Sequence, residues 1–189
     1  PKSCTSSIIN CPLQGECNIN CTAKEKLKGG VCTSSIINCP TDGDCNIICN
    51  GRSVCQGATI NGPTDHTLRI TCTNNYACDH AEIHAENASY LDFMMVQAGT
   101  SAGSSMSIWF PPRNESSKRS YITAMDAGLN GRGGDIPIQF YALNGFEDVD
   151  IDYNSTDYTD HGGIMHCHDG YLDSCWFADD DYSCNDRNT

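Results

Sequence analysis

CTSSIINCPTDGDCNIIC, residues 32–49, repeats almost letter for letter the stretch CTSSIINCPLQGECNINC at 4–21. Two weaker copies follow, CQGATINGPTDHTLRITC at 55–72 and CDHAEIHAENASYLDFMM at 78–95. The four units start 28, 23 and 23 residues apart. A repeat of this length indicates a solenoid, in which each repeat forms one turn of the chain and buries its apolar face only against its neighbours.

Apolar and polar residues alternate within each unit. The fifth residue after the first cysteine is isoleucine in all four units: Ile9, Ile37, Ile60 and Ile83. Near the end of each unit every second residue is Cys, Ile, Leu, Phe or Met, with mostly polar residues between. A period of two predicts strands with one buried face. Since corners rich in Asn, Gly, Pro and Asp join these strands, we predict an all-β, parallel β-helix with two strands per coil and a third short strand in the connector.

The alternation continues after residue 95, although the cysteines are lost. The residues expected to face inward are Met106, Ile108 and Phe110; Tyr121, Thr123 and Met125; Ile136, Ile138 and Phe140; and Val149, Ile151 and Tyr153. We therefore expect a single domain, 1–189, of about six or seven coils. Regular cysteine-rich coils occupy 4–95, degenerate coils with an inserted polar loop at 111–119 occupy 96–160, and a C-terminal end rich in Cys and aromatic residues occupies 161–189.

The chain has 14 cysteines; the commonest spacing between successive ones is five residues, found four times, and none are separated by two as in zinc sites. In the third unit Gly62 and Leu68 replace both members of a cysteine pair, and in the fourth Met95 stands where the third has Cys72, while no cysteine follows six residues later. Cysteines that disappear together are expected to be bonded together. This predicts a disulfide-stapled fold with the bonds Cys11–Cys17, Cys39–Cys45, Cys49–Cys55, Cys72–Cys78 and Cys21–Cys32.

A rival scheme bonds equivalent cysteines of adjacent coils. It stays open at this point, because stacked residues also fall within the Cα distance of about 4.4–6.8 Å that a disulfide needs. Either scheme requires an oxidising compartment, so we expect a protein that is secreted or on a cell surface.

The formal net charge is −13, with only 11 Lys and Arg residues, which argues against nucleic acid as a partner. No segment approaches the roughly 20 apolar residues of a membrane span, so we expect no membrane insertion. Asn87, Asn114 and Asn154 lie in N-x-S/T sequons and are the expected glycosylation sites. We do not count the fourth sequon, at Asn20, among the expected sites because its middle residue, Cys21, is expected to be disulfide-bonded.

The runs CNGRSVCQGATI at 49–60 and CTNNYACDHAEI at 72–83 resemble the cysteine-rich parallel β-helix repeats of large surface and secreted proteins of algae and other eukaryotic microbes, within the pectin-lyase-like β-helix architecture. The resemblance covers residues 4–95, whereas the later half loses the cysteines and gains aromatic residues. It implies an extracellular role in structure, surface coating, an appendage or adhesion.

The alternative is a carbohydrate-binding or polysaccharide-cleaving β-helix protein. Its candidate carboxylates are Asp148, Asp150 and Asp152, with Asp160 and His161 nearby in the sequence. The three Asp residues alternate with apolar residues, which is typical of the solvent face of a strand. Because few basic residues are available to neutralise an acidic sugar, we expect the protein not to be an enzyme.

Two groups of residues could bind metals. Stacked carboxylates could hold calcium, which prefers oxygen ligands. His166 and His168 could share a transition-metal site, whereas Cys167 between them would point to the opposite face of a strand. We favour exposed histidines beside a disulfide-bonded end, and expect no cofactor and no resident metal.

Four cysteines, Cys4, Cys167, Cys175 and Cys184, remain outside the five predicted disulfides. A full repeat follows PKSC at 1–4 directly, which leaves the first coil without a polar cap. We therefore expect subunits, or neighbouring modules of the same protein, to meet head to tail, with the first coil on the segment CWFADDDYSC at 175–184. The predicted function is that of a non-catalytic extracellular structural glycoprotein, a building block of a cell-surface coat, appendage or filament, with extracellular polysaccharide as a further candidate partner.

Overall fold

A computed structural model describes residues 4–23, 30–74, 76–99, 106–111, 120–127, 139–142, 149–154, 164–168 and 173–178. These residues form strands, turns and bends, and no helix occurs among them. The fold is therefore all-β, and five disulfides join its strands and corners.

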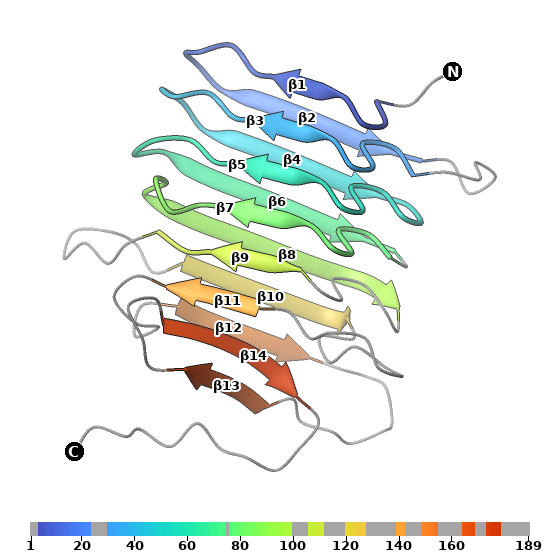
Figure 1. The fold of residues 1–189 in the computed structure, drawn as a ribbon, viewed down its shortest axis with the longest axis vertical. Helices are drawn as coiled ribbons and strands as arrows, with labels where there is room; N and C mark the ends of the chain where they lie inside the picture. Colours follow the sequence, from blue (N-terminus) through green and yellow to red (C-terminus); the bar gives the residue numbers. More distant parts are fainter. Residues whose placement is uncertain are drawn as a thin grey trace.

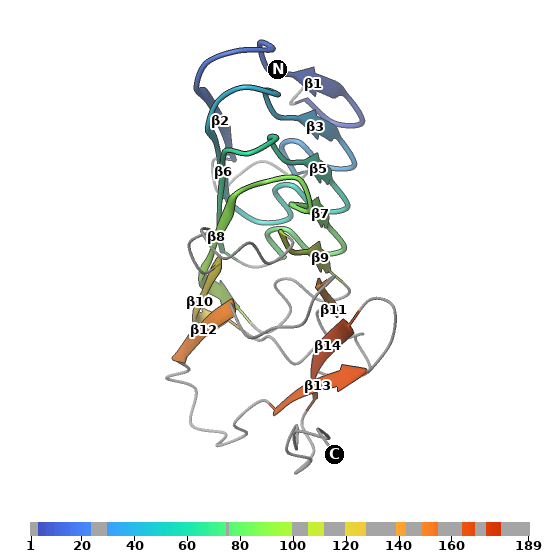
Figure 2. The same cartoon turned by 90° about the vertical axis from the view of Figure 1, so that its left-hand side faces the viewer.

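The strands lie in two sheets, and successive strands from β1 to β12 alternate between them (Figure 1). The eight-stranded sheet consists, in spatial order, of β1 (Ile8–Asn10), β3 (Ile36–Asn38), β5 (Thr59–Asn61), β7 (Glu82–His84), β9 (Ser107–Trp109), β11 (Gln139–Ala142), β14 (Asp173–Ala178) and β13 (Ile164–His168). The six-stranded sheet consists of β12 (Val149–Asn154), β10 (Ser120–Ala127), β8 (Tyr90–Gly99), β6 (Thr67–Thr73), β4 (Cys45–Asn50) and β2 (Cys17–Thr22). Figure 2 shows the two sheets facing each other along the long axis.

The core lies between the two sheets, and the isoleucine column predicted from the repeat is confirmed. Ile9, Ile37, Ile60 and Ile83 are successive partners in the register of β1, β3, β5 and β7. All except Ile9, which lies in the edge strand, are fully buried. Because parallel strands in register stack equivalent residues, the repeat in the sequence becomes a column of like side chains in the core.

The expected third strand per unit is not found in the described residues. Where the connectors were expected to form it, the chain makes turns in which Ser34, Cys55 and Cys78 have positive φ angles of 50°, 55° and 57°. Their backbone N–H groups still bond to neighbouring corners, as from Ser34 to the Gln56 carbonyl oxygen at 2.8 Å. Left-handed residues cannot continue a pleated strand, so the corners stack through hydrogen bonds without forming one.

The register also corrects the inward residues expected at 121–125. Ile122 pairs with the buried Phe93, whereas Tyr121 pairs with Asp92, so Tyr121, Thr123 and Met125 are one residue out of phase with the core column. The sequence YITAM has apolar residues at both odd and even positions, so alternation alone does not say which of them continue the core column. The insertion at 111–119 also interrupts the regular spacing of the repeat. The next segment keeps the expected phase, since Ile151 pairs with Ile122.

The parallel arrangement ends after β11 and β12, each the sixth parallel strand of its sheet. β14 runs antiparallel to β11, and β13 runs antiparallel to β14, so a hairpin lies beyond the last parallel strand of the eight-stranded sheet. Nothing in the apolar alternation distinguishes these two strands from the earlier ones.

Candidate functional site

The five predicted disulfides are present, each across a corner between the two sheets. Cys11–Cys17 and Cys39–Cys45 link the end of a strand in the eight-stranded sheet to the start of one in the six-stranded sheet. The bonds Cys21–Cys32, Cys49–Cys55 and Cys72–Cys78 close the opposite corners.

The rival ladder of bonds between adjacent coils does not occur among these ten cysteines. Cys49 and Cys72 are partners in the register of β4 and β6, so they are neighbours that the rival scheme would bond to each other. Instead, Cys49 bonds to Cys55 and Cys72 bonds to Cys78. Loss of the two cysteines from the third unit also has a physical explanation. Leu68 is fully buried there, and a Cβ atom on Gly62 would lie 3.1 Å from its Cδ2 atom, so the leucine occupies the space that a disulfide fills in the other coils.

The first repeat unit, residues 4–21, has an open edge in both sheets among the described residues. β1 and β2 are the terminal strands, and no further described strand pairs with them. The Cys11 N–H donates to the Asn38 carbonyl oxygen at 2.9 Å, and the Ser7 carbonyl oxygen accepts from the Ile36 N–H at 2.9 Å. Since successive residues of a strand bond to opposite sides, the backbone groups of Ile8 point away from β3 and are available to another strand.

Exposed apolar side chains gather at the same end. Ile8 is 65% exposed and Leu13, in the following corner, is 75% exposed. Cys4 is also exposed, and its thiol is free. Open strand edges, apolar side chains and a thiol therefore lie together on the first coil.

Two of the three cysteines in the C-terminal segment, Cys167 and Cys175, lie at the opposite end of the described strands. Cys167 of β13 and Cys175 of β14 are direct partners in the antiparallel register of the hairpin. Cys184 lies outside the described residues. Of the predicted glycosylation sites, Asn87 is exposed in a turn, Asn154 is the last residue of β12, and Asn114 lies outside the described residues.

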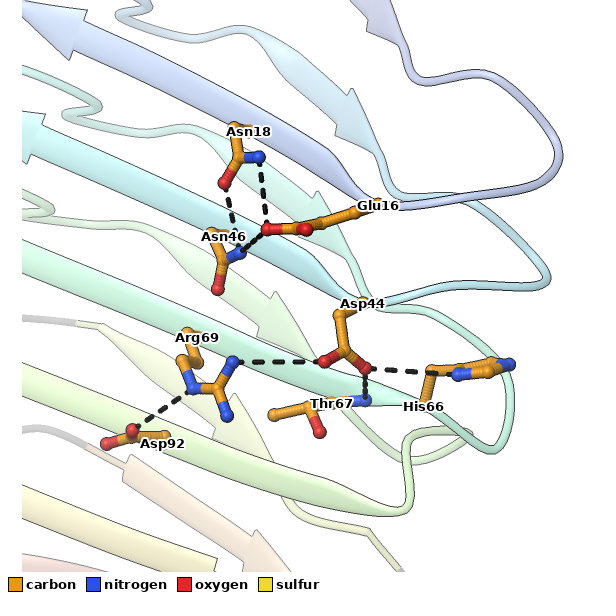
Figure 3. A network of polar contacts seen from close by, with 8 residues as sticks. All are labelled: Glu16, Asn18, Asp44, Asn46, His66, Thr67, Arg69 and Asp92. Carbon is orange, nitrogen blue, oxygen red and sulfur yellow. Dashed lines mark hydrogen bonds and ion pairs between the residues drawn. The ribbon is translucent and has the colours of Figure 1, made fainter.

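A network of polar contacts, which the sequence did not lead us to expect, runs across β2, β4, β6 and β8 on the outer face of the six-stranded sheet (Figure 3). Asn18, Asn46, Arg69 and Asp92 are successive partners in the register of β2, β4, β6 and β8. The Asn46 side-chain amide donates to Glu16 at 2.9 Å and to Asn18 at 3.0 Å. These residues stand fourteen positions after the first cysteine of each unit, so reading that position down the repeat would have found them.

Charged groups continue the network. Arg69 lies between two carboxylates, with Nη1 3.8 Å from Asp44 Oδ2 and Nε 3.6 Å from Asp92 Oδ2. Asp44 also accepts a hydrogen bond from the Thr67 N–H at 3.0 Å. His66 Nε2 lies 3.0 Å from Asp42 and its Nδ1 lies 3.9 Å from Asp44.

This arrangement holds successive strands together. Both ring nitrogens of His66 face carboxylates, and the guanidinium of Arg69 lies between two of them. The ion pairs are partly exposed, and such pairs contribute about 0–1 kcal/mol each. We read the network as a surface ladder that joins successive strands.

A second ladder runs along the outer face of the eight-stranded sheet. The side-chain amide of Asn38 donates to Asn10 at 2.7 Å, and that of Asn61 donates to Asn38 at 2.7 Å. In the same column, the His84 and Trp109 rings stack with their centroids 4.3 Å apart and their planes at 7°. Both outer faces therefore carry columns of interacting side chains from different coils.

The candidates for catalysis and metal binding are placed only in part. Asp150 and Asp152 lie on β12 in register with Tyr121 and Thr123, and His166 and His168 lie on β13. Asp148, Asp160 and His161 lie outside the described residues. Within the described residues, no group of three or more His, Cys, Asp or Glu side chains could hold a calcium or other metal ion. Nor does the described part of the chain contain a helix that is long and apolar enough to cross a membrane.

Comparison with known proteins gives this chain no relative from which a role could be carried over. No match is found among protein-family models, curated proteins or solved structures.

Proposed function

We propose that this protein is a non-catalytic extracellular structural glycoprotein, a building block of a cell-surface coat, appendage or filament that assembles head to tail. In this proposal the alternating strands form the coils of a disulfide-stapled parallel β-helix, a solenoid with an open end. The neighbour is a second subunit or another module of the same protein.

The observation that carries the proposal is the open first coil. Within the described residues nothing pairs with the outer side of β1 or β2, and Ile8 and Leu13 leave apolar surface exposed beside them. Natural proteins usually protect such edges, because a free strand edge pairs readily with another chain. An edge that the described polypeptide leaves open in both sheets favours the continued addition of coils.

The extracellular setting is supported by the five disulfides. Disulfides in this number persist in secreted proteins and are reduced in most cytosols. An exposed Cys4 beside the open edge could add a disulfide across the junction between subunits.

The described strands limit how two subunits can meet. Residues 175–178 of the expected contact segment lie in β14, which is already paired on both sides, so the open edges at this end are β13 and β12. The eight-stranded sheet extends two strands beyond the six-stranded one, an offset of about 10 Å at the usual strand spacing. A rigid neighbour can therefore add its β1 to β13 or its β2 to β12, but not both at once.

Proline at Ile8 tests the proposal. The Ile8→Pro variant removes the outward N–H of β1 and should leave its bonds to β3 intact, while Ile8→Thr removes the apolar side chain and keeps the N–H. We expect unreduced wild-type protein to form filaments in electron micrographs and large species in sedimentation, Ile8→Thr to do so more weakly, and Ile8→Pro to remain monomeric.

Unreduced wild-type protein that stays a monodisperse monomer, with Cys4 a free thiol, would contradict the proposal. Equal assembly of Ile8→Pro and wild type would exclude β1 as the contact strand and leave β2 to be tested in the same way.

A carbohydrate-binding or polysaccharide-cleaving protein is the second candidate. One observation favours it, the convergence of Asp44, Asp92 and Arg69 on one exposed face. Because Arg69 is already neutralised by the two carboxylates, a bound acidic sugar would have to displace one of them. Calorimetric titration with uronate oligosaccharides should therefore give no heat of binding, and binding that is lost in Arg69→Gln would favour this candidate.

A further inference from the structure

The sequon Asn20-Cys21-Thr22 lies on β2, the edge strand of the six-stranded sheet. From the sequence it is the weakest of the four sequons, because its middle cysteine is bonded. In the structure Cys21 is fully buried and bonded to Cys32, whereas Asn20 and Thr22 on either side of it are exposed. Because successive side chains of a strand point to opposite faces, the disulfide lies on the inner face and Asn20 on the outer face. The bond therefore does not hinder access to Asn20.

The two functional side chains of the sequon also lie together. The Thr22 hydroxyl donates a hydrogen bond to the side-chain oxygen of Asn20. In the following coil the position of Asn20 is taken by Ile48, its partner in register. Asn20 is therefore an exposed acceptor amide at the outer surface of the first coil.

The backbone next to this amide belongs to the open edge. The N–H groups of Cys17 and Ala23 donate to β4 and its flank, to the Asp44 and Asn50 carbonyl oxygens at 2.9 Å each. By the alternation of a parallel strand, the backbone groups of Asn20 and Thr22 point to the other side, where another subunit would add its strand. A bulky group on Asn20 would stand beside that approach.

We propose that Asn20 carries an N-linked glycan and that this glycan shields the open edge of β2 from strand addition. Transfer from a lipid-linked diphosphate donor forms a bond between Asn20 Nδ2 and C1 of the first sugar, breaks the bond between C1 and the diphosphate oxygen, and releases one proton and the lipid diphosphate. A large hydrophilic glycan there protects the edge in the way that charges and prolines protect other edge strands. The shielding role rests on the proposed function, whereas the modification itself requires only that the chain be secreted.

Glycan occupancy tests the site. The full chain is secreted from a eukaryotic host, and an amidase that converts glycosylated Asn to Asp is used in heavy-oxygen water before peptide mapping. We expect the label at position 20 in wild type and in Thr22→Ser, which keeps the sequon, and no label in Thr22→Ala. Asn18→Gln, an exposed change on the same strand outside the sequon, should keep the label. An unlabelled Asn20 in folded wild-type protein would overturn the inference.

Assembly tests the shield. Thr22→Ala should assemble at lower concentration than wild type, whereas Ser89→Ala, which removes the Asn87 sequon far from the open edge, should assemble like wild type. If Asn20 is labelled and Thr22→Ala assembles no better than wild type, the shielding role is wrong. If no form assembles with the glycan removed, the proposed filament function and the shield fail together, while the labelled Asn20 still establishes the modification site.

Discussion

The second and third repeat units, which start at Cys32 and Cys55, close the same corner in two ways. In the second coil Cys39 and Cys45 are bonded, with their Cα atoms 5.7 Å apart. In the third coil Gly62 and Leu68 take these positions, and the flanking strands keep their register, with Asn61 paired to Asn38 and Leu68 to Cys45. The same backbone path is thus held either by a covalent bond or by apolar packing.

The two solutions act on different states of the chain. A disulfide stabilises mainly by restricting the unfolded chain, whereas a buried leucine stabilises the native state by removing its surface from water. The core of each coil is thin, because the columns between the sheets hold Ser, Ala and Cys beside Ile and Leu. A corner can therefore lose its disulfide only where a large side chain replaces it, and this is what Leu68 does beside Gly62.

The largest effect is expected from Leu68→Ala. The side chain is fully buried, no disulfide supports its corner, and the bonds Cys39–Cys45 and Cys49–Cys55 hold the two preceding corners in place, so we expect the cavity to collapse only in part. We expect a loss of about 3 kcal/mol in the free energy of unfolding, measured by denaturation of unreduced protein in guanidinium. The control is Leu13→Ala at an exposed position, which should change stability by less than about 0.5 kcal/mol. Similar losses in both variants would mean that Leu68 does not replace the disulfide.

A smaller loss is expected when the bond of the second coil is removed. The double variant Cys39→Ala with Cys45→Ala opens a loop whose ends are six residues apart, for which the chain-entropy relation gives about 2 kcal/mol. The same denaturation measures this loss. The matched control removes Cys11 and Cys17, whose bond closes a loop of the same length in the edge coil. Since the loops are equal, the two losses should agree within about 1 kcal/mol, and a much larger loss in the second coil would show that packing outweighs loop entropy.

Much of this design could be read from the sequence. The repeat predicts the isoleucine column, and the joint loss of cysteines predicts the five bonds, because both follow from stacking equivalent residues at a fixed spacing. The outer ladder of Asn18, Asn46, Arg69 and Asp92 follows the same rule, and it was missed because polar residues on a strand are usually no more than its solvent face. The ion pairs depend on side-chain conformations that no spacing specifies.

Other features lie beyond the repeat. The left-handed conformation of Cys55 and Cys78 has no signal in residue type, since neither is a residue that favours positive φ. The register of β10 could not be predicted because YITAM has apolar residues at both odd and even positions. The antiparallel hairpin of β13 and β14 was missed because strand direction depends on the path of the chain, which the alternation does not encode.

The smallest net effect is expected from restoring the missing bond. The double variant Gly62→Cys with Leu68→Cys copies the second coil into the third, where the backbone is in the same register, so the new bond should form and appear in non-reducing peptide maps. Its gain of about 2 kcal/mol is offset by the apolar surface lost with Leu68 and by a Cβ atom at position 62, which would lie only 2.8 Å from the His84 carbonyl oxygen. We expect the unfolding free energy of this variant to lie within about 1 kcal/mol of that of wild type.

The control, Gly62→Ser with Leu68→Cys, has the same crowding and no bond, and should be less stable than the bonded variant by about 2 kcal/mol. A bonded variant more than about 2 kcal/mol above wild type would mean that the leucine is a poor substitute for the disulfide, and that the third coil lost its cysteines for a reason other than packing.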